Sequence, residues 1–309
     1  MQVFSSTVNQ MMVLFIFMAL GYFLNKAKLL PPNASVTISR LETNVLVPCL
    51  VFNTFYKYCT VQNISQKWTY IVYGIAIMAV SIAIGVILSR IFAKEDYLRK
   101  IYNYSFAVAN FSFMGNAVVL GIFGEDVLFD YMIFTLPLCL YVYSFGIAML
   151  IPKKENQNNK FSLKVFLNPI CISMFLGAAV GLSGLPIPKF LGTAIAQAGS
   201  CMSPLAMILT GFIVANYSLK TLASQKRIYL ASILRLIILP SIFVIVLKLL
   251  KTDSTIIMLT LCATAMPLGL NTVVFPAAYG GDTTPGASMA LISHLMSVIT
   301  IPVMFAIFI

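Results

Sequence analysis

The chain has 309 residues and a formal net charge of +11, and 60% of its residues are hydrophobic while only 9% are charged. Its mean hydropathy of +0.95 lies far outside the range of a soluble domain, which needs a polar surface. The positive charge does not indicate a nucleic-acid-binding protein, because the basic residues are distributed over many loops and form no single patch. The composition therefore predicts a polytopic membrane protein.

Crossing a bilayer core of about 30 Å takes roughly 20 apolar residues, because a helix rises about 1.5 Å per residue. Ten stretches of the chain reach or approach this length. In chain order they are approximately 6–25, 36–56, 68–89, 102–123, 131–151, 165–185, 191–217, 228–247, 256–278 and 286–308. The predicted fold class is an all-α membrane protein with ten transmembrane helices.

The loop charges predict the orientation. No basic segment precedes the first apolar stretch, so we expect a retained first span and not a cleaved signal peptide. The loops after spans one, three, five and seven hold Lys26, Lys28, Arg40, Arg90, Lys94, Arg99, Lys100, Lys153, Lys154, Lys160, Lys164, Lys220, Lys226 and Arg227. The opposite loops hold only Lys57, Lys67, Lys189, Lys248 and Lys251. Because cytoplasmic loops are rich in Lys and Arg, we expect the first set in the cytoplasm and both termini outside the cytoplasmic membrane.

A shift of 156 residues aligns the chain with itself at residues that interrupt helices. The coincident pairs are Gly21 with Gly177, Pro32 with Pro188, Pro48 with Pro204, Gly124 with Gly280, and Asp126 with Asp282. This predicts a first five-helix repeat over 1–151, a cytoplasmic connecting loop over 152–164 and a second repeat over 165–309. Because five is an odd number, the second repeat would be inverted with respect to the first, an architecture typical of secondary transporters.

The shift overlays FSFMGNAVVLGIFGED in span four on PLGLNTVVFPAAYGGD in span nine. Both segments put glycine, asparagine or proline inside a membrane helix, where broken backbone is tolerated if it lines a cavity or is buried in protein. We expect spans four and nine to be broken so that free backbone groups face a ligand, with helix packing as the alternative. The candidate substrate-binding residues are Asn110, Ser112, Gly115, Asn116, Pro267, Asn271 and Thr272. Their amide and hydroxyl groups can bind a carboxylate without a buried cation.

These segments resemble the auxin efflux carrier family, which includes plant PIN-type carriers and bacterial permeases. The resemblance is carried by AMPLGLNTVVFPAAYGGD and ASMALISHLMSVITIP in the second half, and by NVLVPCLVF and NFSFMGNAVVLGIFG in the first. It implies ten spans in two inverted repeats, a substrate site where spans four and nine cross, and a homodimer. The chain departs from the PIN-type pattern at Ala117, where those carriers have proline, so unwinding of span four must depend on Gly115 and neighbouring Asn and Ser residues.

Further residues are expected beside this site. Those predicted to kink or line spans two, seven and nine are Pro48, Asn53, Pro204, Thr210 and Pro276. Arg235 in span eight either binds an anion or extends to the cytoplasmic interface, and the second interpretation is favoured. Glu42 is expected to pair with Arg40 at the interface, with a proton-coupling carboxylate as the alternative. His294 in span ten either couples transport to pH or stays neutral and bonded to a neighbouring helix.

Three functions were weighed against one another. Gly181-Leu182-Ser183-Gly184 matches the GxSG pattern of rhomboid-type intramembrane proteases, with His294 as the base, but that interpretation leaves the duplication unexplained. A membrane sensor on a transporter scaffold is the second alternative. No nucleotide motif is present, no cofactor or metal is expected, and the six cysteines are interpreted as small apolar residues. The favoured function is a secondary transporter that moves small organic anions by alternating access, with membrane lipid as its surroundings.

Overall fold

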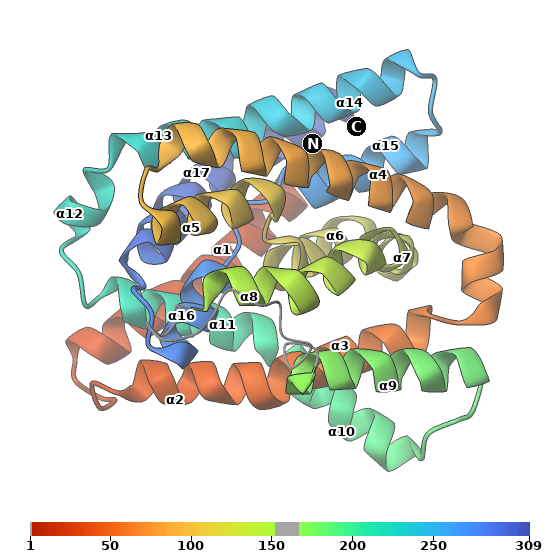
Figure 1. Cartoon of the computed structure of the whole chain (residues 1–309), viewed down its shortest axis with the longest axis horizontal. Helices are drawn as coiled ribbons and strands as arrows, with labels where there is room; N and C mark the ends of the chain where they lie inside the picture. Colours follow the sequence, from red (N-terminus) through yellow and green to blue (C-terminus); the bar gives the residue numbers. More distant parts are fainter. Residues whose placement is uncertain (1, 152–166) are drawn as a thin grey trace.

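The structure is a computed structural model that describes residues 2–151 and 167–309, and these residues form helices joined by short turns (Figure 1). The helices of the first half, where η marks a π-helical turn, are α1 (Gln2–Lys26), α2 (Ala34–Leu41), η1 (Glu42–Leu46), α3 (Val47–Tyr58), α4 (Val61–Phe92), α5 (Asp96–Ala107), η2 (Phe111–Gly115), α6 (Asn116–Phe123), α7 (Glu125–Tyr141), η3 (Val142–Gly146) and α8 (Ile147–Leu150). Those of the second half are α9 (Pro169–Ser183), α10 (Lys189–Ser200), α11 (Met202–Val214), α12 (Leu219–Ala223), α13 (Lys226–Ile233), η5 (Leu234–Ile238), α14 (Leu239–Leu249), α15 (Ser254–Thr264), α16 (Asn271–Tyr279) and α17 (Thr284–Phe308). The predicted connecting loop 152–164 lies outside the described residues.

Within residues 2–151 and 167–309, seven helical segments are long and apolar enough to cross a membrane. They are Phe4–Lys26, Ala34–Tyr58, Val61–Phe92, Asp126–Leu150, Lys189–Val214, Lys226–Leu249 and Thr284–Phe308, which match predicted spans one, two, three, five, seven, eight and ten. Span six is represented by α9, whose 15 residues extend about 22 Å. Spans four and nine contain shorter helices, because each is interrupted near its middle.

The long helix α4 shows why the outer surface of the molecule is apolar. Its buried residues include Gly74, Ser81 and Gly85, whose small side chains let the helix approach its neighbours. A Cβ atom at Gly74 would lie 2.1 Å from the carbonyl oxygen of Phe134 on α7, so the two backbones touch. The larger side chains Ile87 and Ile91 point outward and are 62% and 71% exposed. Small residues inside and large apolar residues outside are typical of a helix that contacts lipid.

Glycines related by the 156-residue shift occupy similar structural positions. Gly21 lets α1 pack directly on the backbone of α11, and Gly177 does the same for α9 against α3. Gly124 and Gly280 have φ angles of +83° and +73° and end helices α6 and α16, where a left-handed backbone favours glycine. Gly21 and Gly177 thus make the same kind of helix contact, whereas Gly124 and Gly280 share a positive φ but differ in ψ, −174° against 26°.

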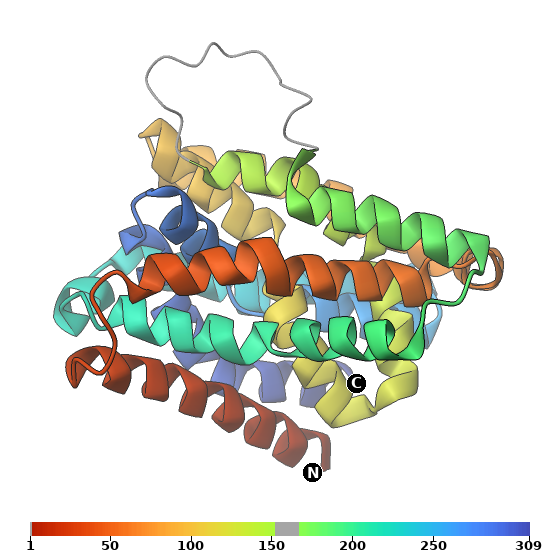
Figure 2. The same ribbon diagram turned by 90° about the horizontal axis from the view of Figure 1, so that it is seen from below.

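The turns between helices gather at two opposite ends of the molecule (Figure 1, Figure 2). One end, on the left of Figure 1, holds the turn after α1, the turn after α4 and helix α12; the turns before α4, α10 and α15 lie at the other end. At the first end the Tyr97 hydroxyl donates to the carbonyl oxygen of Asp282, 3.5 Å away. At the second, Lys67 forms an ion pair with Asp130. The described turns that are rich in Lys and Arg therefore lie at the same end of the molecule.

Candidate functional site

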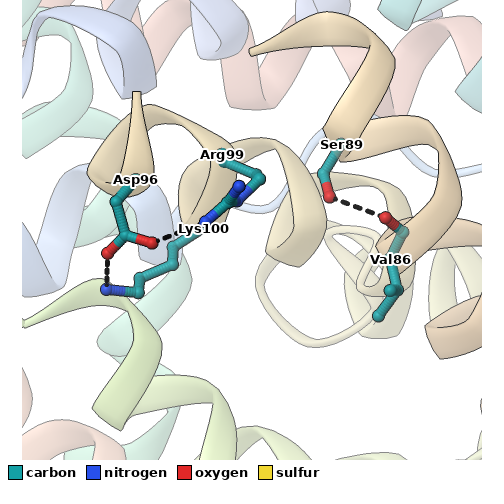
Figure 3. Close-up of polar contacts among 5 residues, drawn as sticks. All are labelled: Val86, Ser89, Asp96, Arg99 and Lys100. Carbon is teal, nitrogen blue, oxygen red and sulfur yellow. Dashed lines mark hydrogen bonds and ion pairs between the residues drawn. The ribbon is translucent and has the colours of Figure 1, made fainter. Parts of the chain in front are cut away.

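The first broken segment starts at the surface with helix α5. Asp96 in its first turn accepts hydrogen bonds from Lys100 and from Arg99, the second with an N–O distance of 2.8 Å, while Ser89 donates to Val86 nearby at the end of α4 (Figure 3). The hydrogen bonds from Lys100 and Arg99 hold the pKa of the Asp96 carboxyl below its ordinary value. A negative charge in the first turn and positive charges one turn later suit the helix dipole and fix where α5 begins.

The two broken segments cross at one point. Helix α5 ends at Ala107 and is followed by extended backbone at Val108, and α15 ends at Thr264 and is followed by a bend. Ala109 and Leu268 form an antiparallel bridge, and the backbone N–H of Asn110 donates to the carbonyl oxygen of Pro267 at 2.8 Å. The breaks lie where the glycine and asparagine pattern predicts them. Because the extended segments pair with each other through this bond, part of the backbone exposed by the breaks is satisfied internally, as the interior of a membrane protein requires.

Asn110 holds the crossing segment in place through its side chain. Its Oδ1 accepts from the backbone N–H of Met114 at 3.2 Å, and its Nδ2 donates to Nε2 of His294 at 3.2 Å. Nδ1 of His294 donates to the carbonyl oxygen of Ala290 at 2.8 Å. Both ring nitrogens are therefore engaged, and the bonding pattern corresponds to the neutral imidazole with its proton on Nδ1. His294 thereby joins α17 to the crossing.

Asn271 and Thr272 open the second half-helix, α16. The Nδ2 of Asn271 donates to the hydroxyl of Tyr104 at 2.6 Å, and Oγ1 of Thr272 donates to the carbonyl oxygen of Gly269 at 2.9 Å. Tyr104 lies on α5, so the Asn271 bond ties the two broken segments together a second time. In this conformation the amide of Asn271 is occupied by a protein partner.

Gly115 is required by close packing inside the π-helical turn η2. A Cβ atom there would lie 2.4 Å from the hydroxyl oxygen of Tyr131 on α7. That hydroxyl donates to the carbonyl oxygen of Phe111, the first residue of η2, at 2.9 Å. Alanine at position 115 would displace the tyrosine that satisfies this carbonyl. The unwinding of span four without a proline at position 117 thus rests on Gly115, Asn110 and Tyr131.

Ser112 and Asn116 face a small cavity beside the crossing. It is bounded by α3, η2, α6, α7 and η3, and its polar lining is Thr54, Ser112, Asn116, Thr135 and Tyr143. Its volume is about 10 Å³, roughly the space for one water molecule on this measure. No described residue hydrogen-bonds the side chain of Asn116, so its amide is free to meet a ligand. The cavity is too small for an organic acid in this conformation.

The five residues predicted to kink or line spans two, seven and nine differ in their burial. Pro48 and Pro276 are buried inside α3 and α16, and the hydroxyl of Thr210 is bonded within α11 to the carbonyl oxygen of Ala206 at 2.7 Å. Pro204 and Asn53 are half-buried in α11 and α3. None of these five borders the cavity beside Asn116, whose lining from span two includes Leu50, Val51, Thr54 and Phe55.

The favoured interpretations of the two charged residues are wrong. Arg235 does not extend to the interface: it is 2% exposed, and its Nε and Nη1 have no hydrogen-bond partner among the described residues. It lines a cavity of about 20 Å³ together with Ala107 and Thr264, the last residues of α5 and α15, where helix dipoles are negative. Glu42 does not pair with Arg40, because Glu42 is fully buried while Arg40 is exposed. Packing against residues far away in the sequence buries both side chains, and the sequence pattern does not show that packing.

The residues of the protease alternative do not form a dyad. Ser183 is exposed, and its hydroxyl donates to the carbonyl oxygen of Val180 at 2.8 Å near the end of α9. His294 is fully buried on α17, and its ring nitrogens face Ala290 and Asn110. A serine nucleophile needs a base within hydrogen-bonding distance, which is missing between these two side chains.

Sequence reasoning missed the buried tyrosines that support the crossing, Tyr104, Tyr131 and Tyr143. All three are at most 1% exposed, and the first two bond to the broken segments. Tyrosines in membrane helices usually gather at the lipid–water interface, so hydroxyls in mid-span positions were a signal for internal polar contacts.

Comparison with known proteins gives the family. A family model described as membrane transport protein matches residues 6–305. An uncharacterized transporter from Methanothermobacter thermautotrophicus is 23% identical over 304 residues, which cover 97% of this chain and 98% of that protein. Together with the apolar helices, these matches identify a multi-pass membrane protein of transport function. The chain belongs to the membrane transport protein family, the family of the auxin efflux carriers and PIN-like transporters.

Proposed function

We propose that this protein is a secondary transporter that moves small organic anions across the cytoplasmic membrane by alternating access. The observation that carries the proposal is the crossing of two broken helices at Ala109 and Leu268, next to a cavity that presents the free amide of Asn116. Broken helices that meet inside a membrane protein offer backbone dipoles and amide groups to a substrate. In this proposal the substrate carboxylate is bound by Asn116, Ser112 and the backbone of η2.

The proposed architecture has ten spans in two inverted repeats, 1–151 and 165–309, joined by a cytoplasmic loop over 152–164, with both termini outside. Support comes from the equivalent roles of Gly21 and Gly177, and of Gly124 and Gly280. Spans four, six and nine would then cross the bilayer as the shorter helices α5 and α6, α9, and α15 and α16. The homodimer implied by the family resemblance remains a prediction.

Alternating access would explain why the cavity is small. In the conformation described, the part of the molecule that contains the crossing lies against α3, and it would separate from α3 to admit a substrate. With no nucleotide motif in the sequence, the energy would come from a gradient or from the membrane potential. One elementary charge moved through 100 mV corresponds to about 2.3 kcal/mol, or roughly a fiftyfold bias for a monoanion.

Counterflow in proteoliposomes tests the function directly. Vesicles containing the purified protein and an unlabelled carboxylate are diluted into the same labelled carboxylate, using a panel that includes lactate and malate. We expect transient accumulation of label for at least one member of the panel. Binding of a panel member without any exchange would instead support the sensor, and neither binding nor exchange of any carboxylate would contradict the organic-anion assignment.

A further inference from the structure

Glu42 is a buried acid that the proposed binding site does not use. It lies at the start of the π-helical turn η1 in span two and is 0% exposed. Neither carboxyl oxygen has a hydrogen-bond partner, and none of the ion pairs among the described residues includes it. A carboxyl group in this situation is unusual, because buried acids in membrane proteins normally pair with a cation or with a polar network.

Among the described residues, no cation pairs with Glu42. The helices packed against η1 are α2, α3, α9, α10, α11 and α16. Their titratable or charged groups, with the nearby hydroxyl of η3, are Arg40, Cys49, Tyr56, Lys57, Tyr58, Cys171, Lys189, Tyr279 and Tyr143, with Cys201 at the junction of α10 and α11. Arg40, Lys57, Lys189, Tyr279 and Cys201 are exposed, and the Cys171 thiol donates to the carbonyl oxygen of Tyr143 at 2.8 Å. An ionised, unpaired carboxylate is strongly disfavoured in such an interior, so Glu42 is uncharged in this conformation.

Glu42 also lies at a contact between two broken or irregular elements. Ser39, three residues earlier and therefore on the same helical face, donates from its hydroxyl to the carbonyl oxygen of Val274 in α16. Helix α16 is the half-helix that leaves the crossing, and it packs against both α2 and η1. The π-helical turn at Glu42–Leu46 is a form often found at functional sites, because it loosens the regular helical bonding. If α16 separates from span two, water reaches the carboxyl group.

We propose that Glu42 binds and releases one proton in each transport cycle, so that the organic anion and a proton cross the membrane together. This inference rests on the proposed transport function. When the interface between α16 and span two is open toward one side, the Glu42 carboxylate takes a proton from water on that side as the anion binds, and the interface closes over an uncharged carboxyl group. When the interface opens toward the opposite side, the O–H bond breaks, the proton passes to water there and the anion leaves. The empty protein returns with Glu42 ionised and α16 still separated from span two, so that water reaches the carboxylate. A monoanion carried with one proton moves no net charge, so a pH gradient drives its accumulation.

The test uses the full-length protein in proteoliposomes, with the membrane potential held at zero by valinomycin and equal potassium on both sides. Labelled lactate is present at equal concentration inside and outside, and the outside is made one pH unit more acidic. Lactate that enters protein-free liposomes is subtracted. If lactate is the exchanged monoanion, the parent is expected to accumulate it up to about tenfold, the limit set by one pH unit; if counterflow selects another monocarboxylate, that acid replaces it.

Glu42→Gln is expected to abolish this accumulation while keeping counterflow within about twofold of the parent, because exchange needs no net proton movement. Glu42→Asp should retain the response. Glu95→Gln is the matched control, since Glu95 is exposed and makes no side-chain cap at α5. Accumulation by Glu42→Gln equal to that of the parent would overturn the inference.

A second measurement covers the case in which Glu42→Gln does not fold. A pH-sensitive dye trapped inside vesicles with the parent protein should report acidification when the anion is added outside, at zero membrane potential. Exchange of the anion without acidification would overturn the inference and leave the transport function intact. Absence of both exchange and acidification for every carboxylate tested would reject the transport function as well.

Discussion

Asn116 and Asn271 carry the same amide group one position apart when the two halves are aligned by the 156-residue shift, but their surroundings differ. The amide of Asn271 donates to the buried hydroxyl of Tyr104 at 2.6 Å. Asn116 borders the cavity and has no hydrogen-bond partner among the described residues. A residue with a free amide is the better candidate for a substrate contact, and a residue with an occupied amide is the better candidate for a structural role.

Replacing these asparagines should separate binding from stability. Asn116→Leu removes a donor for the substrate carboxylate, and a hydrogen bond to a charged group contributes about 1.5–3 kcal/mol, so affinity should fall roughly 10- to 150-fold. Asn271→Leu leaves the Tyr104 hydroxyl without its partner and should lower the free energy of unfolding by about 1–3 kcal/mol. The measurements are thermal unfolding in detergent and its shift with carboxylate.

The control for both variants is Asn33→Leu, because Asn33 is exposed and makes no side-chain cap at α2. It should leave unfolding and carboxylate binding unchanged. Unaltered affinity in Asn116→Leu, with stability also unaltered, would show that the substrate binds elsewhere.

Gly115 gives a second prediction at the level of residues. Gly115→Ala places a methyl group 2.4 Å from the Tyr131 hydroxyl and should reduce stability by about 1–3 kcal/mol, as overpacking of a core does. Combining it with Tyr131→Phe removes the clashing oxygen, so the loss in the double variant should be smaller than the sum of the two single losses. Gly192→Ala is the control, because its neighbour is the flexible end of Ile187. Additive losses in thermal unfolding would refute the steric explanation.

At the scale of the helices, the sequence predicts where spans four and nine are broken, but it does not predict the π-helical turns and the tertiary contacts. The glycine, proline and asparagine pattern places the interruptions of spans four and nine within a few residues of Ala109 and Leu268. The pattern gives no indication of the four π-helical turns among the described residues, η1, η2, η3 and η5. A π-helical turn depends on which tertiary contacts compensate the altered backbone bonding, and those contacts involve residues far away in the sequence.

The crossing itself can be tested with an engineered disulfide. In an antiparallel bridge of the kind formed here, facing residues have Cα atoms about 4.5 Å apart, a separation compatible with a disulfide. Ala109→Cys with Leu268→Cys, in a background without the six natural cysteines, should therefore crosslink under mild oxidation. If the crossing moves as one unit during transport, counterflow should persist after crosslinking.

Mass spectrometry of proteolytic fragments detects the crosslink, and counterflow before and after reduction measures its effect. The pair Ala109→Cys with Val273→Cys is a control that should not crosslink, because Val273 lies beyond the bridge on α16. Loss of transport that returns on reduction would mean that the two strands slide past each other, contrary to a rigid crossing.

At the scale of the whole molecule, the sequence predicts which turns lie at the same end, because the number of spans and the charges of the loops can be read directly from it. The burial of Arg235 and Glu42 could not be predicted, because burial depends on how neighbouring helices pack. A charged residue near the end of an apolar stretch looks like an interfacial residue unless the packing of its neighbours is known. Arg235 lines a cavity with the last residues of α5 and α15, and Glu42 is buried in η1, which packs against α16, so both residues lie next to segments that form the crossing.

The last prediction concerns which end of the molecule faces the cytoplasm. Ser224, on the turn after α12, and Gln66, near the start of α4, are exposed at opposite ends of the molecule, and the basic excess lies at the end that holds α12. In a cysteine-free background, Ser224→Cys should resist a membrane-impermeant thiol reagent in intact cells and react after permeabilisation. Gln66→Cys should react without permeabilisation. Labelling of both positions in intact cells would show leaky membranes, and the reverse pattern would overturn the proposed orientation, with the termini then facing the cytoplasm and the loop 152–164 facing outside.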